Sequence, residues 1–459
     1  MTVKKYNFWV VFFFSLSIVL RFVLALINTE ANDYHFEVID RIMKGLSVNN
    51  TDCWQCYHPK LFHFVAAEVI RILNLTDWRI QMITAQLCNF AAGIATLYII
   101  WISIKELCRN QRIRLIVLAL FALNPRFIAI SSQASNDIFV ILFSTLSIYL
   151  AWQFLKRRSS LWGILSLLAA TLAALSKASG LVLFVCLGLI FFVKLFSPTW
   201  ENLRKKILFL LLMIPMLLIS VFYIGPYHKT YQESGDALTA NVGKGQKLRF
   251  FKKTYSGAPG STSVVDTYMT FRIVDLVRTP YIPEKGYPIN RTSLWSQLYG
   301  RAVFLQFDQY PFSWRNTAPS VINLGRALMI LGLFPAAFFL VGLTFEITKY
   351  LRRFLKTGFS YFATNPNWIF PLFSVAFLAM EVDLTANYRD FVAMKDIYIF
   401  PALLGFSYCL IIGLKKYWVR LSKYRLLLVS FLALLLILWI IDTSILIANL
   451  LPGFLEYII

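Results

Sequence analysis

The sequence predicts an all-α polytopic membrane protein with about eleven transmembrane helices, on three observations. First, 58% of the 459 residues are hydrophobic and the mean hydropathy is +0.64, so a soluble chain could not cover its own surface. Second, apolar runs of about 18 or more residues recur along the chain, each long enough to cross the hydrocarbon core of a bilayer. Third, the placement of Lys and Arg indicates how often the chain crosses.

Basic residues gather in every second connection between the apolar runs. Lys4 and Lys5 precede the first run, so the positive-inside rule places the N-terminus in the cytoplasm. Adding or removing one span would put a basic cluster on the outer side. We therefore expect spans at residues 8–27, 82–104, 115–123, 137–156, 161–175, 181–193, 207–224, 321–343, 368–380, 398–414 and 426–447.

The net charge of +22 follows from this orientation pattern and does not by itself indicate a nucleic-acid ligand. A basic groove with aromatic stacking platforms is not evident. The spans predict an N-terminal transmembrane module (1–224), a second large outer loop (225–320) and a C-terminal transmembrane module (321–459).

The first outer loop, residues 28–81, is the stretch around which the rest of the chain is organised. Two segments of it, 35–46 and 60–73, have apolar residues at helical spacing but are too short to span a membrane. We expect two amphipathic helices in the interface plane. The loop also concentrates acids and histidines, which favours an active site: Asp33, His35, Glu37, Asp40, Asp52, His58 and His63.

Asp33 is the candidate general base. A partly desolvated carboxylate near a membrane interface can accept the proton of a hydroxyl group. The same position also fits a solvated cap, because Asp is favoured just before a helix.

Cys53, Cys56 and His58 suggest a zinc site, with His35 or Asp52 completing four ligands. A single CxxC is weak support, because structural zinc sites usually need a second pair. A short-loop disulfide, permitted on the oxidising outer side, or a pair of free thiols is the better-supported interpretation.

Cations at the outer ends of spans could stabilise a leaving phosphate. Each could instead be an anchor whose charged end reaches the interface. Glu381, Asp383, Asp390 and Asp396 form an acidic group that we expect to be a solvated turn rather than an acceptor contact. The candidate cations are Arg126, Lys177, Arg301, Arg326, Arg389 and Lys395.

Five stretches occur in an order that resembles a known superfamily. They read NDYHF from Asn32, CYHPKLFHF from Cys56, NPRFIAISSQASNDIFVILF from Asn124, ALSKASGLVLF from Ala174 and, more faintly, RDFVAMKDIYIFPALLGF from Arg389. Their order and topological positions resemble the polyprenyl-phosphate-sugar-dependent glycosyltransferases of the GT-C superfamily. Protein O-mannosyltransferases and bacterial aminoarabinose transferases belong to it.

The resemblance implies a GT-C-like fold and inverting sugar transfer from a dolichyl or undecaprenyl phosphate to an acceptor hydroxyl of a protein, glycan or lipid. The reaction would take place on the luminal or periplasmic face, in the endoplasmic reticulum or a bacterial inner membrane. No cofactor is required, although a divalent metal near His58 is possible.

For individual residues, the resemblance implies Asp33 as base and Asp137 as a second acid facing the site. Asp137 could equally be an acid at a helix N-terminus. Lys60 replaces the small residue or proline usual in the family's run, which leaves the loop conformation open. The resemblance favours Lys177 and either Arg389 or Lys395 for phosphate. The full set of expected substrate-binding residues is His35, His58, Lys60, Arg126, Lys177, Arg301, Arg389 and Lys395.

Two other function classes compete. A transporter or flippase usually carries charged or helix-breaking residues within its spans and shows paired repeats, whereas here the acids gather outside. A membrane O-acyltransferase would need a His within or beside a span, and all four His lie in outer segments. A non-enzymatic scaffold would not need so dense a polar loop.

Overall fold

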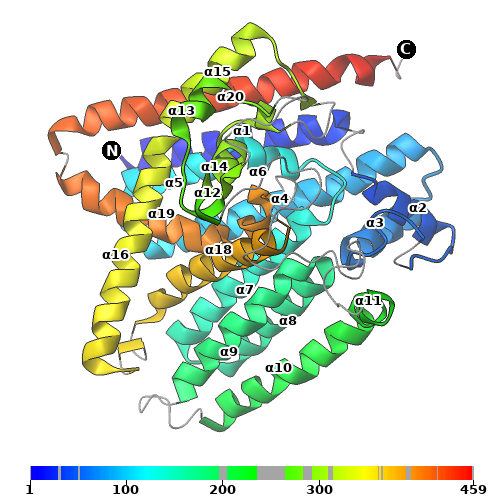
Figure 1. Cartoon of the computed structure of the whole chain (residues 1–459), viewed down its shortest axis with the longest axis horizontal. Coiled ribbons are helices and arrows are strands. Elements are labelled where there is room, and N and C mark those ends of the chain that lie inside the picture. Colours follow the sequence, from blue (N-terminus) through cyan, green and yellow to red (C-terminus); the bar gives the residue numbers. More distant parts are fainter. Residues whose placement is uncertain are drawn as a thin grey trace.

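The computed structural model of the chain is all-α (Figure 1), as the sequence predicts. Every regular element in the described residues is a helix. The structure describes residues 2–28, 33–49, 52–195, 204–234, 264–282, 292–308, 314–359, 361–362, 365–388, 394–420 and 422–456.

Within these residues, eight apolar segments are long enough to cross a membrane, so the chain is a multi-pass membrane protein. Three segments combine two elements: η1 (Ala178–Leu181) with α9 (Val182–Leu195), α15 (Pro319–Leu331) with α16 (Leu333–Thr357), and η6 (Pro366–Trp368) with α18 (Ile369–Tyr388). The other five are α1 (Val3–Ile27), α4 (Trp78–Leu107), α7 (Asp137–Arg157), α10 (Arg204–Ile224) and α20 (Arg425–Leu455).

The remaining three predicted spans coincide with α5 (Gln111–Ala122), α8 (Ser160–Ser176) and α19 (Leu403–Arg420). The first two have 12 and 17 residues, short for a full crossing. A helix is thus present at every predicted span, but the number of eleven crossings is not confirmed.

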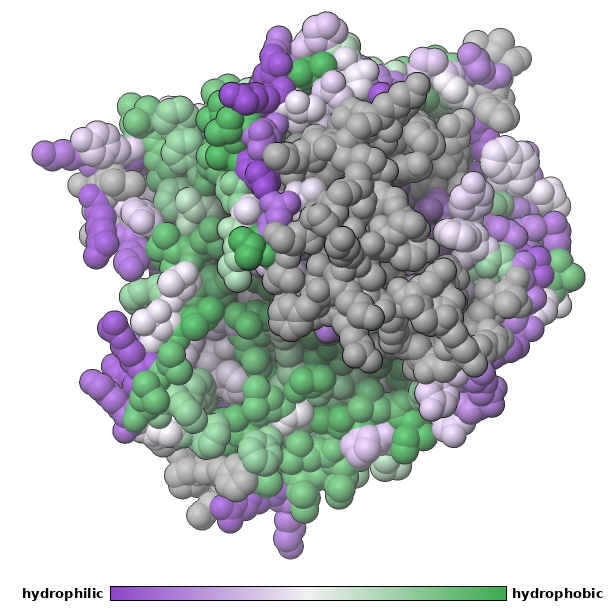
Figure 2. Space-filling model, viewed as in Figure 1, coloured by the Kyte–Doolittle hydropathy of each residue, from purple (hydrophilic) through white to green (hydrophobic). Residues whose placement is uncertain are grey.

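Apolar side chains cover the outside of the helical body. Figure 2 shows them across the lower part of the face, over α8 to α10, with polar residues at the rims. On α10, Leu212, Met216 and Ile219 are each more than half exposed. Such a surface suits contact with lipid chains rather than water.

The first outer loop contains two short helices, as predicted, although both end earlier than expected. They are α2 (His35–Met43) and α3 (Leu61–Ile72), and they pack against each other. Val38 and Ile39 on α2 and Phe62 on α3 are fully buried. Figure 1 places the pair at one end of the helical body.

The segment after Pro125, expected to be a short outer connection, is buried inside the protein. It forms α6 (Pro125–Ile130), with Pro125 in its first turn, where a missing N–H costs nothing. The Asn124 side chain caps the helix by accepting from the Phe127 N–H at 2.8 Å. Residues 127–132 are almost completely buried. The connection therefore carries Arg126 into the interior instead of leaving it at the rim.

Part of the second outer loop also packs on the body. Its described helices are α11 (Tyr227–Ser234), α12 (Val264–Tyr268), α13 (Ile273–Arg278) and α14 (Leu294–Val303), followed by η4 (Leu305–Phe307). Helix α14 contacts α6 and also η7 (Asp396–Tyr398), the turn that precedes η8 (Phe400–Ala402) and α19. Residues from all three predicted parts of the chain therefore meet around α14.

Candidate active site

Asp33 lies two residues before the start of α2 and has an unusual backbone conformation. Asp33 and Tyr34 have φ angles of 46° and 62°, a left-handed region that costs side-chain-bearing residues about 1–2 kcal/mol each. Tyr34, not Asp33, is the N-cap of α2, and it makes no side-chain cap bond. The Asp33 carboxylate instead accepts a hydrogen bond from Gln55 Nε2 at 3.1 Å. The solvated-cap alternative is therefore wrong.

Three charged groups act on Asp33. Its side chain is open to solvent on one side, but the protein around it raises the pKa of the carboxyl. Lys395 and Lys177 oppose that rise, and Asp137 adds to it. Asp33 is therefore electrostatically coupled to both predicted phosphate-binding lysines and to the second acid.

Asp137 and Lys177 form a nearly buried ion pair. Asp137 is the first residue of α7, and Lys177 follows the last turn of α8. Ser135 Oγ donates to Asp137 Oδ2 at 3.3 Å, and Lys177 Nζ lies 4.8 Å from the ring centre of Tyr398. Asp137 thus holds a lysine in addition to placing a negative charge at a helix N-terminus.

Two further ion pairs lie deeper. Arg126 Nε is 3.2 Å from Asp396 Oδ1, and Arg301 Nη1 is 3.2 Å from Asp308 Oδ2. All four side chains are almost inaccessible to solvent. A buried ion would be costly to leave unpaired. The first pair therefore fixes α6 against the segment that carries Lys395, and the second fixes α14 against the end of η4.

The expected solvated acidic turn is wrong for two of its four residues. Glu381 and Asp396 are fully buried, whereas Asp383 is exposed. The inward course of α6 brings Arg126 to Asp396, which accounts for the burial of that acid. Burial raises the pKa of Asp396, and Arg126 opposes that rise. Asp390 lies outside the described residues.

Lys395 shares this environment. Burial lowers the pKa of its ammonium group, and the carboxylates of Asp308 and Asp33 oppose the shift. The positive charges of Arg301 and Lys177 also act on Lys395, so cations from three parts of the chain come together here. Arg389 lies outside the described residues. Arg326 is exposed and donates to Asn323 Oδ1 at 3.0 Å.

The three histidines of the first outer loop form a packed group. His35 Nδ1 lies 2.9 Å from His63 Nε2, and the ring centres of His35 and His58 are 5.7 Å apart. Burial lowers the pKa of all three, to about 3 for His35. They are therefore neutral at physiological pH and supply no positive charge for a phosphate.

Lys60 is directed at its own loop. Its Nζ donates to the carbonyl oxygens of Cys56 and of His58, the latter at 2.7 Å. Burial lowers its pKa to about 8. The lysine that departs from the family pattern therefore ties the loop backbone together.

Cys53 and Cys56 form a disulfide, which confirms the preferred interpretation of the CxxC. Disulfide sulfurs are not thiolate ligands, so the zinc site that includes these cysteines does not fit. No group of three His, Cys, Asp or Glu side chains in the described part of the chain is arranged to hold a metal ion. Gln55, the partner of Asp33, lies inside the disulfide loop.

Comparison with known proteins adds a family match. Residues 70–229 match the model of the dolichyl-phosphate-mannose-protein mannosyltransferase family. The matched segment contains Arg126, Asp137 and Lys177 and begins after Asp33. It supports the superfamily resemblance over that part of the chain. No curated protein sequence matches the chain.

Several solved structures align with the chain. The oligosaccharyltransferase AglB of Archaeoglobus fulgidus, in complex with an inhibitory peptide and a dolichol-phosphate, aligns at 15% identity and a TM-score of 0.45, over 97% of this chain and 56% of that one. The Archaeoglobus fulgidus oligosaccharyltransferase in complex with Zn and sulfate aligns at 12% identity and 0.46, over 94% and 53%. ArnT of Cupriavidus metallidurans, bound to undecaprenyl phosphate, aligns at 13% and 0.37, over 89% and 77%. The chain spans about half the length of the archaeal proteins.

Several residues near the site have no signal in the sequence. Gln55, Asp308 and Tyr398 carry no motif of their own. The spacing of the CxxC could have drawn attention to Gln55, since a disulfide fixes the residues it encloses. Asp308 and Tyr398 enter the site only because α14 and η7 pack together.

Proposed function

We propose that the chain is an integral-membrane inverting glycosyltransferase. It transfers a sugar from a dolichyl or undecaprenyl phosphate to an acceptor hydroxyl on the luminal or periplasmic face. The observation that carries the proposal is the coupling of one solvent-open carboxylate, Asp33, to the cations Lys177 and Lys395.

Asp33 acts as the general base. Its raised pKa makes the carboxylate a stronger proton acceptor than an ordinary aspartate. The acceptor oxygen gives its proton to Asp33 and bonds to the anomeric carbon from the face opposite the phosphate. The bond between that carbon and the phosphate oxygen breaks, and its electron pair leaves with the lipid phosphate. One displacement inverts the anomeric configuration.

Lys177 and Lys395 bind the leaving phosphate, and Arg301 adds positive charge behind them. Fixed cations in a site shielded from water stabilise the charge that develops on a leaving oxygen. Asp137 orients Lys177 through their ion pair. Arg126 acts one step further away, by holding Asp396 next to Lys395.

The family match over residues 70–229 supports sugar transfer over transport without chemistry. The sugar is a hexose or a pentose, and the mannosyltransferase match makes a hexose the first to test. The N-terminus lies in the cytoplasm, and the membrane is that of the endoplasmic reticulum or a bacterial inner membrane. A divalent metal is not required.

The decisive experiment incubates purified protein with labelled polyprenyl-phosphate sugars and identifies the modified product by mass analysis. Asp33→Asn should lower transfer at least about 100-fold. Asp40→Asn is the matched control, because Asp40 is a partly exposed acid of the same loop that pairs only with Lys44 among the described residues. Full activity of Asp33→Asn would refute the assigned base. Lipid translocation in liposomes with no glycosylated product would favour a flippase. Transfer should persist in a chelator.

A further inference from the structure

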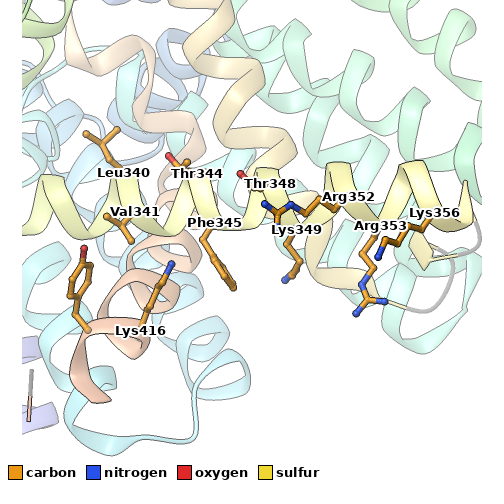
Figure 3. A pocket seen from close by; sticks show the side chains of 11 residues that line it. Leu340, Val341, Thr344, Phe345, Thr348, Lys349, Arg352, Arg353, Lys356 and Lys416 are labelled. Atoms are coloured by element: carbon orange, nitrogen blue, oxygen red, sulfur yellow. The ribbon is translucent and has the colours of Figure 1, made fainter. Parts of the chain in front are cut away.

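A groove lined by α16 and α19 lies on a part of the molecule that the proposed chemistry does not use. Its volume is about 850 Å³, within the range of roughly 300–1,000 Å³ that is typical of ligand sites. Among the described residues, α16 and α19 alone line it (Figure 3): Leu340, Val341, Thr344, Phe345, Thr348, Lys349, Arg352, Arg353, Lys356, Lys416 and Tyr417.

The lining changes in character along α16. Leu340, Val341, Thr344, Phe345 and Thr348 come first, and four basic residues follow. Figure 3 shows the apolar side chains at one end of this stretch and the basic side chains of α16 at the other, with Lys416 of α19 near Val341 and Phe345. From Leu340 to Lys356 the helix rises about 24 Å. The groove therefore joins an apolar region to a cationic one over the length of a lipid headgroup and its upper chains.

The groove is strongly positive. It has five cations and no acid in its lining. Glu346, which is buried, pairs with Lys349 at 2.5 Å. The other four have no ion-pair partner within the described ranges. Arg352 and Lys356 are exposed, and Lys416 Nζ lies 4.5 Å from the ring centre of Phe345.

The groove lies on the side that the charge pattern predicts to be cytoplasmic. Lys194, at the end of α9, donates to the carbonyl of Phe362 just beyond α16 at 2.6 Å. Lys415 of α19 donates to the carbonyl of Leu107 at the end of α4 at 3.2 Å. These helix ends adjoin the predicted inner connections, away from Asp33. Anionic lipids concentrate in the cytoplasmic leaflet and attract basic segments close to the membrane.

We propose that this groove binds an anionic glycerophospholipid of the cytoplasmic leaflet. The phosphate contacts Arg352, Arg353 and Lys356, and Lys416 lies beside Phe345 on the α19 wall. Thr344 and Thr348 can donate to the ester oxygens. One acyl chain lies along Leu340, Val341 and Phe345. The passage from apolar to basic residues along α16 matches the passage from acyl chain to phosphate in the lipid, which favours this ligand over a free anion.

The test measures lipid retention by native mass spectrometry on full-length protein. Protein is reconstituted with dioleoyl phosphatidylglycerol and dioleoyl phosphatidylcholine in equal amounts. The wild type should retain the anionic lipid selectively. In the variant R352Q/R353Q/K356Q, the amount of anionic lipid retained should fall more than about tenfold. The matched control R204Q/K205Q/K206Q removes three exposed charges from the start of α10 and should change it less than about twofold.

Two further measurements test the acyl-chain contact and distinguish a lipid from a free anion. Phe345→Ala leaves every charge in place but should weaken retention, because the acyl chain loses a packing surface. Glycerol 1-phosphate should not displace the bound lipid at concentrations where a dioctanoyl phosphatidylglycerol does. Equal losses in the triple variant and its control would overturn the site. Equal competition by glycerol 1-phosphate would overturn the lipid and leave only an anion site.

Discussion

At the scale of single residues, the chemistry depends on where Asp33 points. Its left-handed backbone and its bond to Gln55 direct the carboxylate away from the cap position of α2. Strained conformations of this kind persist where the surrounding structure holds them, and they cluster at functional sites. Asp33 therefore has both the carboxylate and the position that a general base requires.

The pH dependence of transfer should report the ionisation of Asp33. A base works only when deprotonated, so kcat/KM should fall as the pH drops through its pKa. Burial raises that pKa, so the fall should begin at a higher pH than for an ordinary aspartate. Lys395 opposes the rise, so Lys395→Gln should move the acidic limb to still higher pH, while Lys395→Arg should leave it near its wild-type position. A limb that stays in place in Lys395→Gln would show that this coupling is absent.

At the scale of elements, the disulfide loop and α2 form one functional unit. The Cys53–Cys56 bridge encloses Gln55, which is almost fully buried and donates to Asp33. Lys60 ties the same loop together through two carbonyl groups. The loop thus acts as a small scaffold for the base.

Removing the Gln55 side chain should therefore lower kcat about tenfold, because a hydrogen bond to a charged group is lost. Gln55→Ala is the direct test, with kcat and KM measured separately. C53S/C56S should reduce kcat in the same direction. A reductant should lower kcat of the wild type but not that of C53S/C56S. This comparison distinguishes the loss of the disulfide from other effects of the reductant. Wild-type kcat in Gln55→Ala would contradict the supporting role.

The buried pair Arg126–Asp396 should dominate the stability of the contact between α6 and η7. Arg126→Met leaves a buried carboxylate without its partner and should cost about 3 kcal/mol of unfolding free energy. The double variant R126M/D396L removes both charges and should recover most of the loss. Thermal unfolding in detergent measures both. Lys44→Met, which breaks the exposed pair with Asp40, should change stability by less than about 1 kcal/mol.

At the scale of the whole molecule, the two predicted transmembrane modules share one core. The main hydrophobic cluster contains Leu24 and Ile141 from the first module and Phe370 and Leu435 from the second. Helix α1 packs against α20, and α7 against α18 and α19. The cations of the site can face Asp33 because both modules contribute to this core.

The charge pattern predicts that the site and the basic groove open on opposite sides of the membrane. Single cysteines at Asp40, which is partly exposed, and at Lys356, which is exposed, should react with an impermeant thiol reagent from opposite sides of sealed vesicles. Asp40→Cys should be labelled from the luminal or periplasmic side, and Lys356→Cys from the cytoplasmic side. Labelling of both from one side would contradict the predicted orientation.

The sequence by itself determined the fold class, the positions of the apolar helices and the first outer loop with its two short helices. These features follow from local composition and spacing, which the sequence displays directly. It also singled out Asp33, Asp137, Lys177, Arg301 and Lys395, because acids and cations at the ends of apolar runs are conspicuous. The expected solvated turn before α19 is wrong for Glu381 and Asp396, since local polarity alone does not reveal their burial.

Only the tertiary structure decided which of these residues meet. The inward course of α6 brings Arg126 to Asp396, and the contact of α14 with η7 brings Arg301 and Asp308 to Lys395. These partners lie far apart in the sequence; Arg126 and Asp396 are 270 positions apart. Their burial depends on packing between distant segments, and no local pattern of residues encodes which distant charge will neutralise another.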